Sequence, residues 1–257
     1  VLPLMEHKLH ISALQSSLII TTFSVIAIIF IPIAGYLSDR IGRKKVIIPS
    51  LIITGIGGLI AGLGAMLFEH SYTFILIGRL LQGLGASGAF PVVIPLVGDM
   101  FKNEKKVSNA LGILETSNTA GKVLSPIIGS IFAAFIWYFP FIAIPILCLI
   151  SIIMVGSSVH APKMKEKPKP VGQFIKDVLH IYKVNWKWIS AVFLIGCIIM
   201  FVLFGTLFYL SELLESHYHL KGVKKGFIIA IPLFALCVCS LITGKKIGQN
   251  KQLMKWL

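Results

Sequence analysis

The sequence predicts an all-α fold, a polytopic bundle of membrane-spanning helices. Apolar residues make up 56% of the 257 residues, and the mean hydropathy of +0.89 lies well above that of a soluble globular domain. The apolar residues are grouped in runs of about 20, the length that a helix needs to cross about 30 Å of hydrocarbon. Because these runs lack the alternation of barrel strands, we expect helices, which satisfy their own backbone polar groups.

Seven apolar runs are long enough to cross a membrane. In chain order they cover residues 18–37, 46–68, 72–98, 107–135, 139–159, 188–214 and 226–243. Residues 1–3 read like the outer end of a further helix whose body is missing, and nothing near them resembles a signal peptide. Counting that clipped helix, the sequence predicts eight helices.

The positive charges predict the topology of these helices. The chain has a net charge of +14, and its basic residues gather in alternate connections, at positions 40–45, 102–106, 163–187 and 245–255. The connections near Glu69 and at 137–140 carry no Lys or Arg, and only 221–225 breaks the contrast. By the positive-inside rule, we expect a multi-pass plasma-membrane protein with Val1 outside and Leu257 in the cytoplasm. Since the membrane accounts for the charge, we expect lipid partners and no nucleic acid.

Residues 161–187 divide the chain into two parts. Their first segment, APKMKEKPKPVG, is rich in Pro and Lys and predicts a cytoplasmic linker. Apolar residues then recur at helical spacing, at Phe174, Val178, Ile181 and Trp186. This spacing predicts a short amphipathic helix on the inner leaflet, although a disordered tether stays open. Residues 1–160 would form an amino-terminal six-helix bundle with a truncated first helix, and residues 188–257 the first two helices of a carboxy-terminal bundle.

The connection GYLSDRIGRKKVIIP, residues 35–49, carries five charges. We expect Gly35 and Gly42 to permit tight turns and close helix approach. Anionic headgroups would anchor the bases, which are Arg40, Arg43, Lys44 and Lys45. Anchoring does not explain Asp39, because an acid at the carboxyl end of a helix meets the negative end of the helix dipole.

This connection resembles the G-x-L-a-D-r-x-G-r-k signature that follows the second helix of major facilitator superfamily transporters. The matching residues are Gly35, Leu37, Asp39, Arg40, Gly42, Arg43 and Lys44. The resemblance implies that Asp39 meets a helix amino terminus in the other half. It also implies that Arg43 pairs with an acid at the inner end of the fourth helix, where Asp99 lies. The implied role is a charge latch on the cytoplasmic side, released by protonation or by substrate.

A second stretch, RLLQGLGASGA, is similar to the fourth-helix pattern R-x-x-q-G-x-g-a of the same family. It carries Arg79, Gln82, Gly83, Gly85 and Ala86. We expect Gly83 and Gly85 to provide a small surface on which helices approach closely in lipid. Two interpretations of Arg79 stay open: a guanidinium on a functional path, or a structural one bonded to backbone carbonyls of a neighbouring helix.

The fifth helix contains a third stretch, GILETSNTAGKVLSPIIGS, which resembles the G-x-x-x-G-P-x-x-G-G motif of the family's proton-coupled antiporters. The matching positions are Gly121, Ser125, Pro126, Gly129 and Ser130, with serine at 125 and 130 where glycine is usual. Pro126 breaks a backbone hydrogen bond and is expected to bend the helix. The bend is either a pivot for rocking or a static kink.

The same helix carries Glu115 and Lys122, two turns apart on one face, with Asn118, Ser125 and Gly129 along the same stripe. Lipid does not tolerate both charges, so the stripe should face the bundle interior or a water-filled cavity. Glu115 is the candidate proton or substrate-cation site, and Lys122 is its candidate counter-charge. They are separated by about 11 Å along the axis, so a direct pair needs both side chains stretched. The alternative, that each bonds to a different helix, stays open.

The resemblance implies a fragment of a drug:proton antiporter-like transporter that lacks most of helix 1 and the last four helices. Its function would be proton-coupled efflux of small amphiphilic organic compounds by alternating access, with a proton gradient and no cofactor. We expect a monomer if the protein is full length. A sugar or metabolite symporter of the same fold is the alternative, and a non-transporting remnant or a seven-helix receptor-like protein is an alternative of another class.

Two further expectations concern chemistry. No nucleophile, base and acid occur together at one depth, so we expect no enzymatic activity. His217 and His219 flank a tyrosine in an outer loop, and we expect no metal site there.

Residues 243–252, TGKKIGQNKQ, align with the connection after the second helix as a decayed copy in which Lys245 replaces the acid. This alignment fits an internal repeat.

Overall fold

The computed structural model describes residues 2–68, 71–159, 170–220 and 222–247. Across these ranges the backbone is helical with short connections and contains no strand. The helices are α1 (Leu2–Leu9), α2 (Ala13–Ile41), α3 (Arg43–Leu67), α4 (Tyr72–Met100), α5 (Glu104–Phe135), α6 (Phe139–Ser158), α7 (Val171–Ser216) and α8 (Gly222–Ile247). Most of the predicted linker at 161–169, and residues 248–252 of the predicted repeat, lie outside the described residues.

Local sequence explains where several helices begin and end. Ser12 starts α2 with a capping box: its backbone N–H donates to Gln15 Oε1 at 2.9 Å, and the Gln15 N–H donates to Ser12 Oγ at 3.3 Å. Asn103 starts α5, where its side-chain oxygen accepts from two backbone N–H groups of the first turn. Gly42 separates α2 from α3 at a φ of +106°, a conformation that side chains rarely adopt.

The predicted membrane bundle is confirmed, with one difference in the spans. Among the described residues, six helices are long and apolar enough to cross a membrane: α2, α3, α4, α6, α7 and α8. The remaining predicted span, residues 107–135, forms most of α5, which is 32 residues long but is not one of these six. Glu115, Lys122 and the hydroxyl and amide side chains between them make α5 less apolar than its neighbours.

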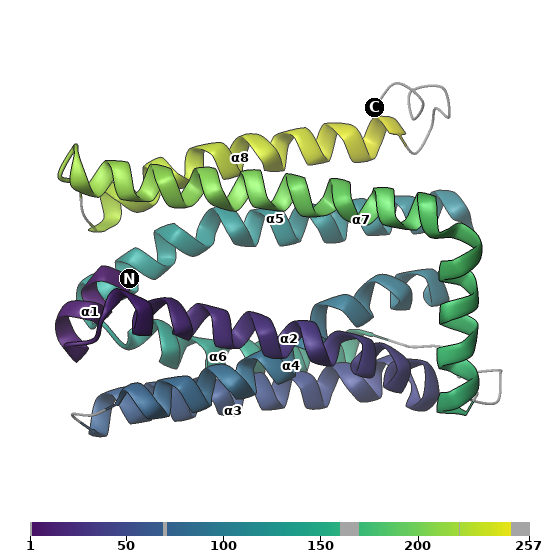
Figure 1. Cartoon of the computed structure of the whole chain (residues 1–257), viewed down its shortest axis with the longest axis horizontal. Coiled ribbons are helices and arrows are strands. Elements are labelled where there is room, and N and C mark those ends of the chain that lie inside the picture. The colour runs from purple at the N-terminus through teal and green to yellow at the C-terminus, as the bar shows by residue number, and fades with distance from the viewer. Residues whose placement is uncertain (1, 69–70, 160–169, 221, 248–257) are drawn as a thin grey trace.

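The helices form two layers in Figure 1. In one layer, α4 packs against α3 and α2, and α3 also packs against α6. In the other layer, α5 packs along α8, and α7 makes a smaller contact with α8. The sequence assigns α5 to the amino-terminal bundle, whereas in the structure its contact with α8 is far more extensive than its contacts with α4 and α6.

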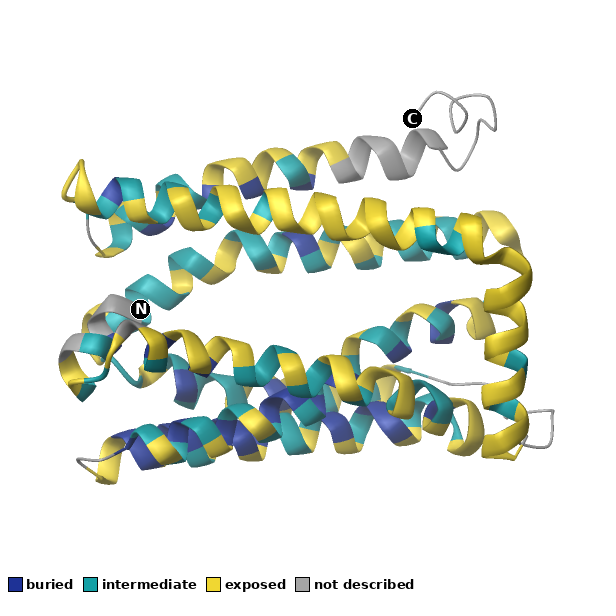
Figure 2. Cartoon of the chain, viewed as in Figure 1, coloured by how far each residue is buried: buried dark blue, intermediate teal, exposed yellow. Residues whose placement is uncertain are grey.

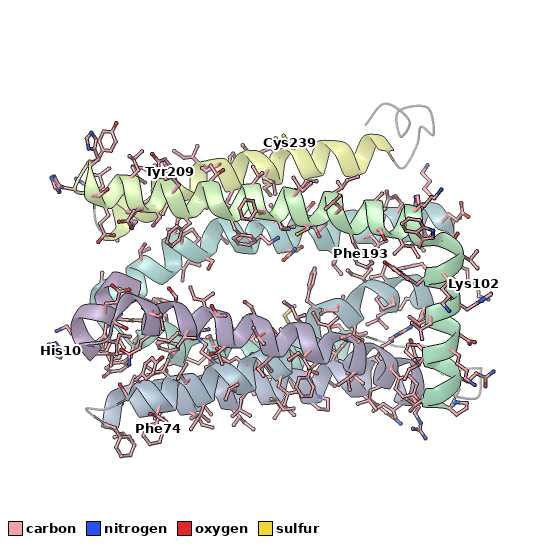
Figure 3. The ribbon with its side chains drawn as sticks, in the orientation of Figure 1. His10, Phe74, Lys102, Phe193, Tyr209 and Cys239 are labelled. Atoms are coloured by element: carbon pink, nitrogen blue, oxygen red, sulfur yellow. The ribbon has the colours of Figure 1, made fainter. Side chains whose placement is uncertain are left out.

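The first part of α7 follows the predicted linker. Residues 171–187 are helical, so a disordered tether does not hold for this segment. The helix kinks at Asn185 (φ −113°, ψ 21°), and Figure 1 shows its first part crossing the end of both layers before it turns along α8. In Figure 3, Lys102 lies near this crossing segment, whereas His10 lies at the opposite end of the molecule.

Burial is concentrated between α3 and α4, as Figure 2 shows, whereas most of α7 is exposed. Small residues make this close contact: a Cβ built on Gly57 would lie 2.6 Å from the Gly78 carbonyl oxygen. Small side chains let helix backbones approach closely in lipid. The exposed side chains of α7 are mainly large and apolar, including Phe193, Phe201 and Phe208. Such a surface suits contact with lipid or with other apolar helices.

Candidate functional site

Arg43, at the start of α3, joins the ends of three helices. Its Nε donates to Asp99 Oδ2 at 3.0 Å, and its Nη1 donates to Ser38 Oγ at 2.7 Å. Nη1 also forms an ion pair with Asp39, one turn earlier in the chain. The pair between Arg43 and Asp99 that the resemblance implied is therefore present. Asp39, which was expected to meet a helix amino terminus in the other half, is compensated here by Arg43.

The two glycines and Arg40 in the connection between α2 and α3 only partly follow the sequence-based prediction. Gly42 makes the turn, and Arg40 is exposed in the last turn of α2. Gly35 makes neither a turn nor a close contact with the described residues, because α2 continues to Ile41 and a Cβ on Gly35 would meet nothing within 4 Å. Among the described residues, Gly35 therefore has neither of the two roles expected of it.

Lys44 was expected to anchor to headgroups, but it binds the end of α6. Its Nζ donates to the carbonyl oxygens of Gly156 at 2.7 Å and Val159 at 2.9 Å. The last carbonyls of a helix lack partners within the helix, and a cation there also meets the negative end of the dipole. The connection between α2 and α3 thus holds α6 as well as α4.

Arg79 lies between α4 and α6. Its Nη1 donates to Gln82 Oε1 at 2.9 Å, and its guanidinium carbon lies 5.1 Å from the centroid of the Phe141 ring. This is the geometry of a cation–π contact. Arg79 Nε and Gln82 Nε2 are buried and have no hydrogen-bond partner among the described residues. Within that part of the chain, Arg79 does not bond to backbone carbonyls of a neighbouring helix, the alternative left open by the sequence.

Gly83 and Gly85 bring α4 against two different helices. A Cβ on Gly83 would lie 2.5 Å from the Phe23 carbonyl oxygen on α2. A Cβ on Gly85 would lie 2.6 Å from the backbone nitrogen of Thr54 on α3. These two positions therefore require small residues for the packing of α2, α3 and α4.

An open pocket of about 500 Å³ lies between α5, α7 and α8, and several of its lining residues are exposed. Its volume falls within the range of sites for small organic molecules. The α5 wall is mainly polar and consists of Ser117, Asn118, Gly121, Lys122 and Ser125. The opposite wall is apolar and consists of Leu203, Phe204 and Leu207 of α7 and Leu233 of α8. Sequence reasoning identified most of the α5 residues but missed the apolar wall.

Glu115 lies beside this pocket rather than in its lining. Its side chain is exposed, and Oε1 accepts from Asn118 Nδ2 at 3.4 Å. Asn118 itself lines the pocket. Glu115 and Lys122 form no ion pair with each other, and within the described residues neither side chain bonds to a different helix. Both arrangements that the sequence left open are therefore absent from this part of the chain.

The close approach of α5 to α8 comes from a residue outside the motif. Cβ atoms on Gly121 and Gly129 would meet nothing within 4 Å, so these glycines do not serve close packing among the described residues. A Cβ on Gly226 of α8, in contrast, would lie 2.8 Å from the Pro126 carbonyl oxygen and 2.6 Å from Ser130 Oγ. The packing role of Gly226 was not predicted from the sequence, because this glycine follows a charged connection and matches no motif.

The connection from α7 to α8 holds a second ion pair. Lys225 Nζ donates to Glu215 Oε2 at 2.6 Å, and both side chains are partly buried. This pair accounts for one of the bases that break the charge contrast between connections. His217 and His219 are exposed nearby. Within the described ranges no group of three or more His, Cys, Asp or Glu residues is arranged to hold a metal ion.

Comparison with known proteins identifies the family. The model of the Major Facilitator Superfamily matches residues 1–255. The chain is 52% identical over its whole length to the bacillibactin exporter of Bacillus subtilis (strain 168) and covers 64% of that protein. It is 25% identical over 226 residues, 87% of the chain, to the quinolone resistance protein NorA of Staphylococcus aureus (strain MRSA252), and covers 56% of NorA. The chain thus spans less than two thirds of the length of these relatives. Since the family match covers nearly every residue and agrees with the three motifs, the chain belongs to the major facilitator superfamily, a family of membrane transporters.

Proposed function

We propose that this protein exports a small amphiphilic organic compound across the plasma membrane by proton-coupled alternating access. The observation that carries the proposal is the pocket between α5, α7 and α8, whose one wall is polar and whose other wall is apolar. Such walls suit a compound with one polar and one apolar part. Export, rather than uptake, is supported by the relative with 52% identity, whose name describes an exporter.

The first substrate to test is bacillibactin, because identity is 52% to its exporter and 25% to the quinolone resistance protein. Cells with and without the gene are compared, and bacillibactin is quantified in cells and medium by mass spectrometry. We expect cells without the gene to retain the compound and release less of it, and the intact gene to restore release. Unchanged release would contradict this substrate, and reduced retention without the gene would indicate uptake instead of export.

Proton coupling is assigned to Glu115. Its carboxylate accepts from Asn118, which lines the pocket, so a proton on Glu115 changes the hydrogen bonding of the pocket wall. Proton and substrate would then compete through this pair. Lys122, which lines the pocket, is also ionisable. We assign the proton to Glu115 because a carboxylate becomes neutral when it takes up a proton, whereas an amine becomes charged.

Alternating access is assigned to movement between the two layers. Arg43 ties α2, α3 and α4 together at one end, so these helices would move as one body. The pocket lies in the other layer, where Gly226 of α8 packs tightly on Pro126 of α5. Rocking about such a contact would expose the pocket to one side at a time.

The end of the molecule that carries Lys102 is proposed to face the cytoplasm. His10 lies at the opposite end, and both side chains are exposed (Figure 3). To test this orientation, a cysteine is introduced by His10→Cys or by Lys102→Cys. Intact cells that carry each variant are then treated with a maleimide that does not cross membranes. We expect labelling at position 10 and protection at position 102, and the reverse pattern would contradict the orientation.

A further inference from the structure

Lys122 lies near the middle of α5, 18 residues after its start at Glu104. A cation at that depth is costly unless it faces a polar cavity or a partner. Lys122 lines the pocket and is only partly exposed. The part of the chain that the structure describes gives its ammonium group no hydrogen bond and no ion pair. Its three donors are therefore available to a molecule in the pocket.

Among the described residues, two acids on the helices that line the pocket are engaged elsewhere. Glu115 lies two turns away, about 11 Å along the helix, and its carboxylate accepts from Asn118. Glu215, at the far end of α7, is paired with Lys225 at 2.6 Å. Among the described residues of the lining, Lys122 is also the one charged side chain, beside the polar groups of Ser117, Asn118 and Ser125. The polar wall therefore carries a net positive charge.

The opposite wall of the pocket favours a ligand that also has an apolar part. Leu203, Phe204 and Leu207 of α7 and Leu233 of α8 offer apolar surface and one aromatic ring. A ring or hydrocarbon chain gains free energy by leaving water for such a surface. The two walls together fit a molecule that has an acidic group on one side and an apolar body on the other.

We propose that the pocket takes an amphiphilic organic anion, whose charged oxygen atoms are held by Lys122 and whose apolar part lies against Phe204. The inference rests on the proposed transport function and names the chemical class of its substrate. It also gives two ionisable side chains of α5 different roles: Lys122 binds the charged group of the ligand, and Glu115 carries the transported proton. A charge-assisted hydrogen bond to an ammonium group is among the stronger polar contacts in proteins.

The test compares two probes of nearly the same shape. 8-Anilino-1-naphthalenesulfonate carries a sulfonate, and N-phenyl-1-naphthylamine is the same ring system without it. In the natural full-length protein, the cysteines at 148, 197, 237 and 239 are changed to alanine, and Ser117→Cys places a thiol in the pocket lining. The rate of its alkylation by N-ethylmaleimide is measured in detergent against increasing concentrations of each probe.

We expect the sulfonate probe to protect the thiol at about tenfold lower concentration than the neutral probe. Lys122→Gln should raise the protecting concentration of the sulfonate probe about tenfold and leave the neutral probe unchanged, whereas Lys122→Arg should keep most of the protection. Lys106→Gln, an exposed lysine in the first turn of α5, is the matched control and should change neither. Equal protection by the two probes in the protein with Lys122 intact overturns the inference, even if Lys122→Gln fails to fold.

Binding and transport are scored separately. Charge-selective protection without export of any compound would refute the proposed function and leave the anion site standing. If the protein exports bacillibactin but the two probes protect the thiol equally, the proposed function is supported and the anion site is refuted. An unchanged protecting concentration in Lys122→Gln, with normal protection by the neutral probe, would also refute it.

Discussion

Gly85→Ala should loosen the contact between α4 and α3. The added Cβ would lie 2.6 Å from the backbone nitrogen of Thr54, about 0.8 Å inside the 3.4 Å at which ordinary van der Waals contact begins. A backbone atom cannot rotate away, so the helices must separate. Overpacking of this kind costs about 1–3 kcal/mol, and the better helix propensity of alanine restores about 1 kcal/mol. We expect the free energy of unfolding to fall by up to about 2 kcal/mol.

Gly98 on the same helix provides the control. A Cβ there would meet nothing within 4 Å, so Gly98→Ala should leave the free energy of unfolding unchanged or raise it by up to about 1 kcal/mol. Both variants are unfolded by titration with sodium dodecyl sulfate, followed by circular dichroism. If Gly85→Ala proves as stable as Gly98→Ala, the reasoning from backbone approach is refuted.

Three further predictions use the same preparations. Lys44→Gln removes a charged donor from two carbonyls at the end of α6, so the free energy of unfolding should fall by about 1–3 kcal/mol, while exposed Lys45→Gln changes it by less than about 0.5 kcal/mol. Phe141→Leu should destabilise the protein by about 1 kcal/mol more when Arg79 is present than in an Arg79→Met background, because only the first case loses a cation–π contact. Glu115→Gln should abolish the response of export to a proton gradient, whereas Glu115→Asp should retain part of it.

Each of these predictions has an outcome that contradicts it. Equal destabilisation by Lys44→Gln and Lys45→Gln would mean that capping of α6 contributes little. If Phe141→Leu lowers the free energy of unfolding equally in both backgrounds, the Phe141 ring contributes packing but no cation–π contact. Gradient-driven export that survives Glu115→Gln at full rate would remove Glu115 from the proton path.

The helical bundle could be predicted because its signals are local. A run of about 20 apolar residues reports a span without reference to any other part of the chain. Residues 107–135 form a run of sufficient length and so predict a span like the others, although Glu115 and Lys122 make this run less apolar. The packing of α5 on α8 was not predictable, because it depends on Gly226 meeting Pro126, a contact between residues 100 positions apart.

The candidate site was predicted to about half its extent. Polar residues inside a span are conspicuous, so the α5 wall with Asn118, Lys122 and Ser125 could be recognised from the sequence. The apolar wall could not, because Phe204 facing a pocket and Phe208 facing outward are the same residue type on one helix. Charged side chains likewise reveal their presence but not their partners, which is why Lys44 was assigned to headgroups and not to the end of α6.

Proton-coupled export can be measured in inside-out membrane vesicles, whose interior corresponds to the outside of the cell. Vesicles with the full-length protein are given an acidic interior, and the uptake of bacillibactin is measured with and without a protonophore. We expect uptake above that of vesicles lacking the protein, and we expect this uptake to be lost when the protonophore dissipates the gradient. Uptake equal to that of the empty vesicles, or uptake that the protonophore does not change, would contradict proton-coupled export.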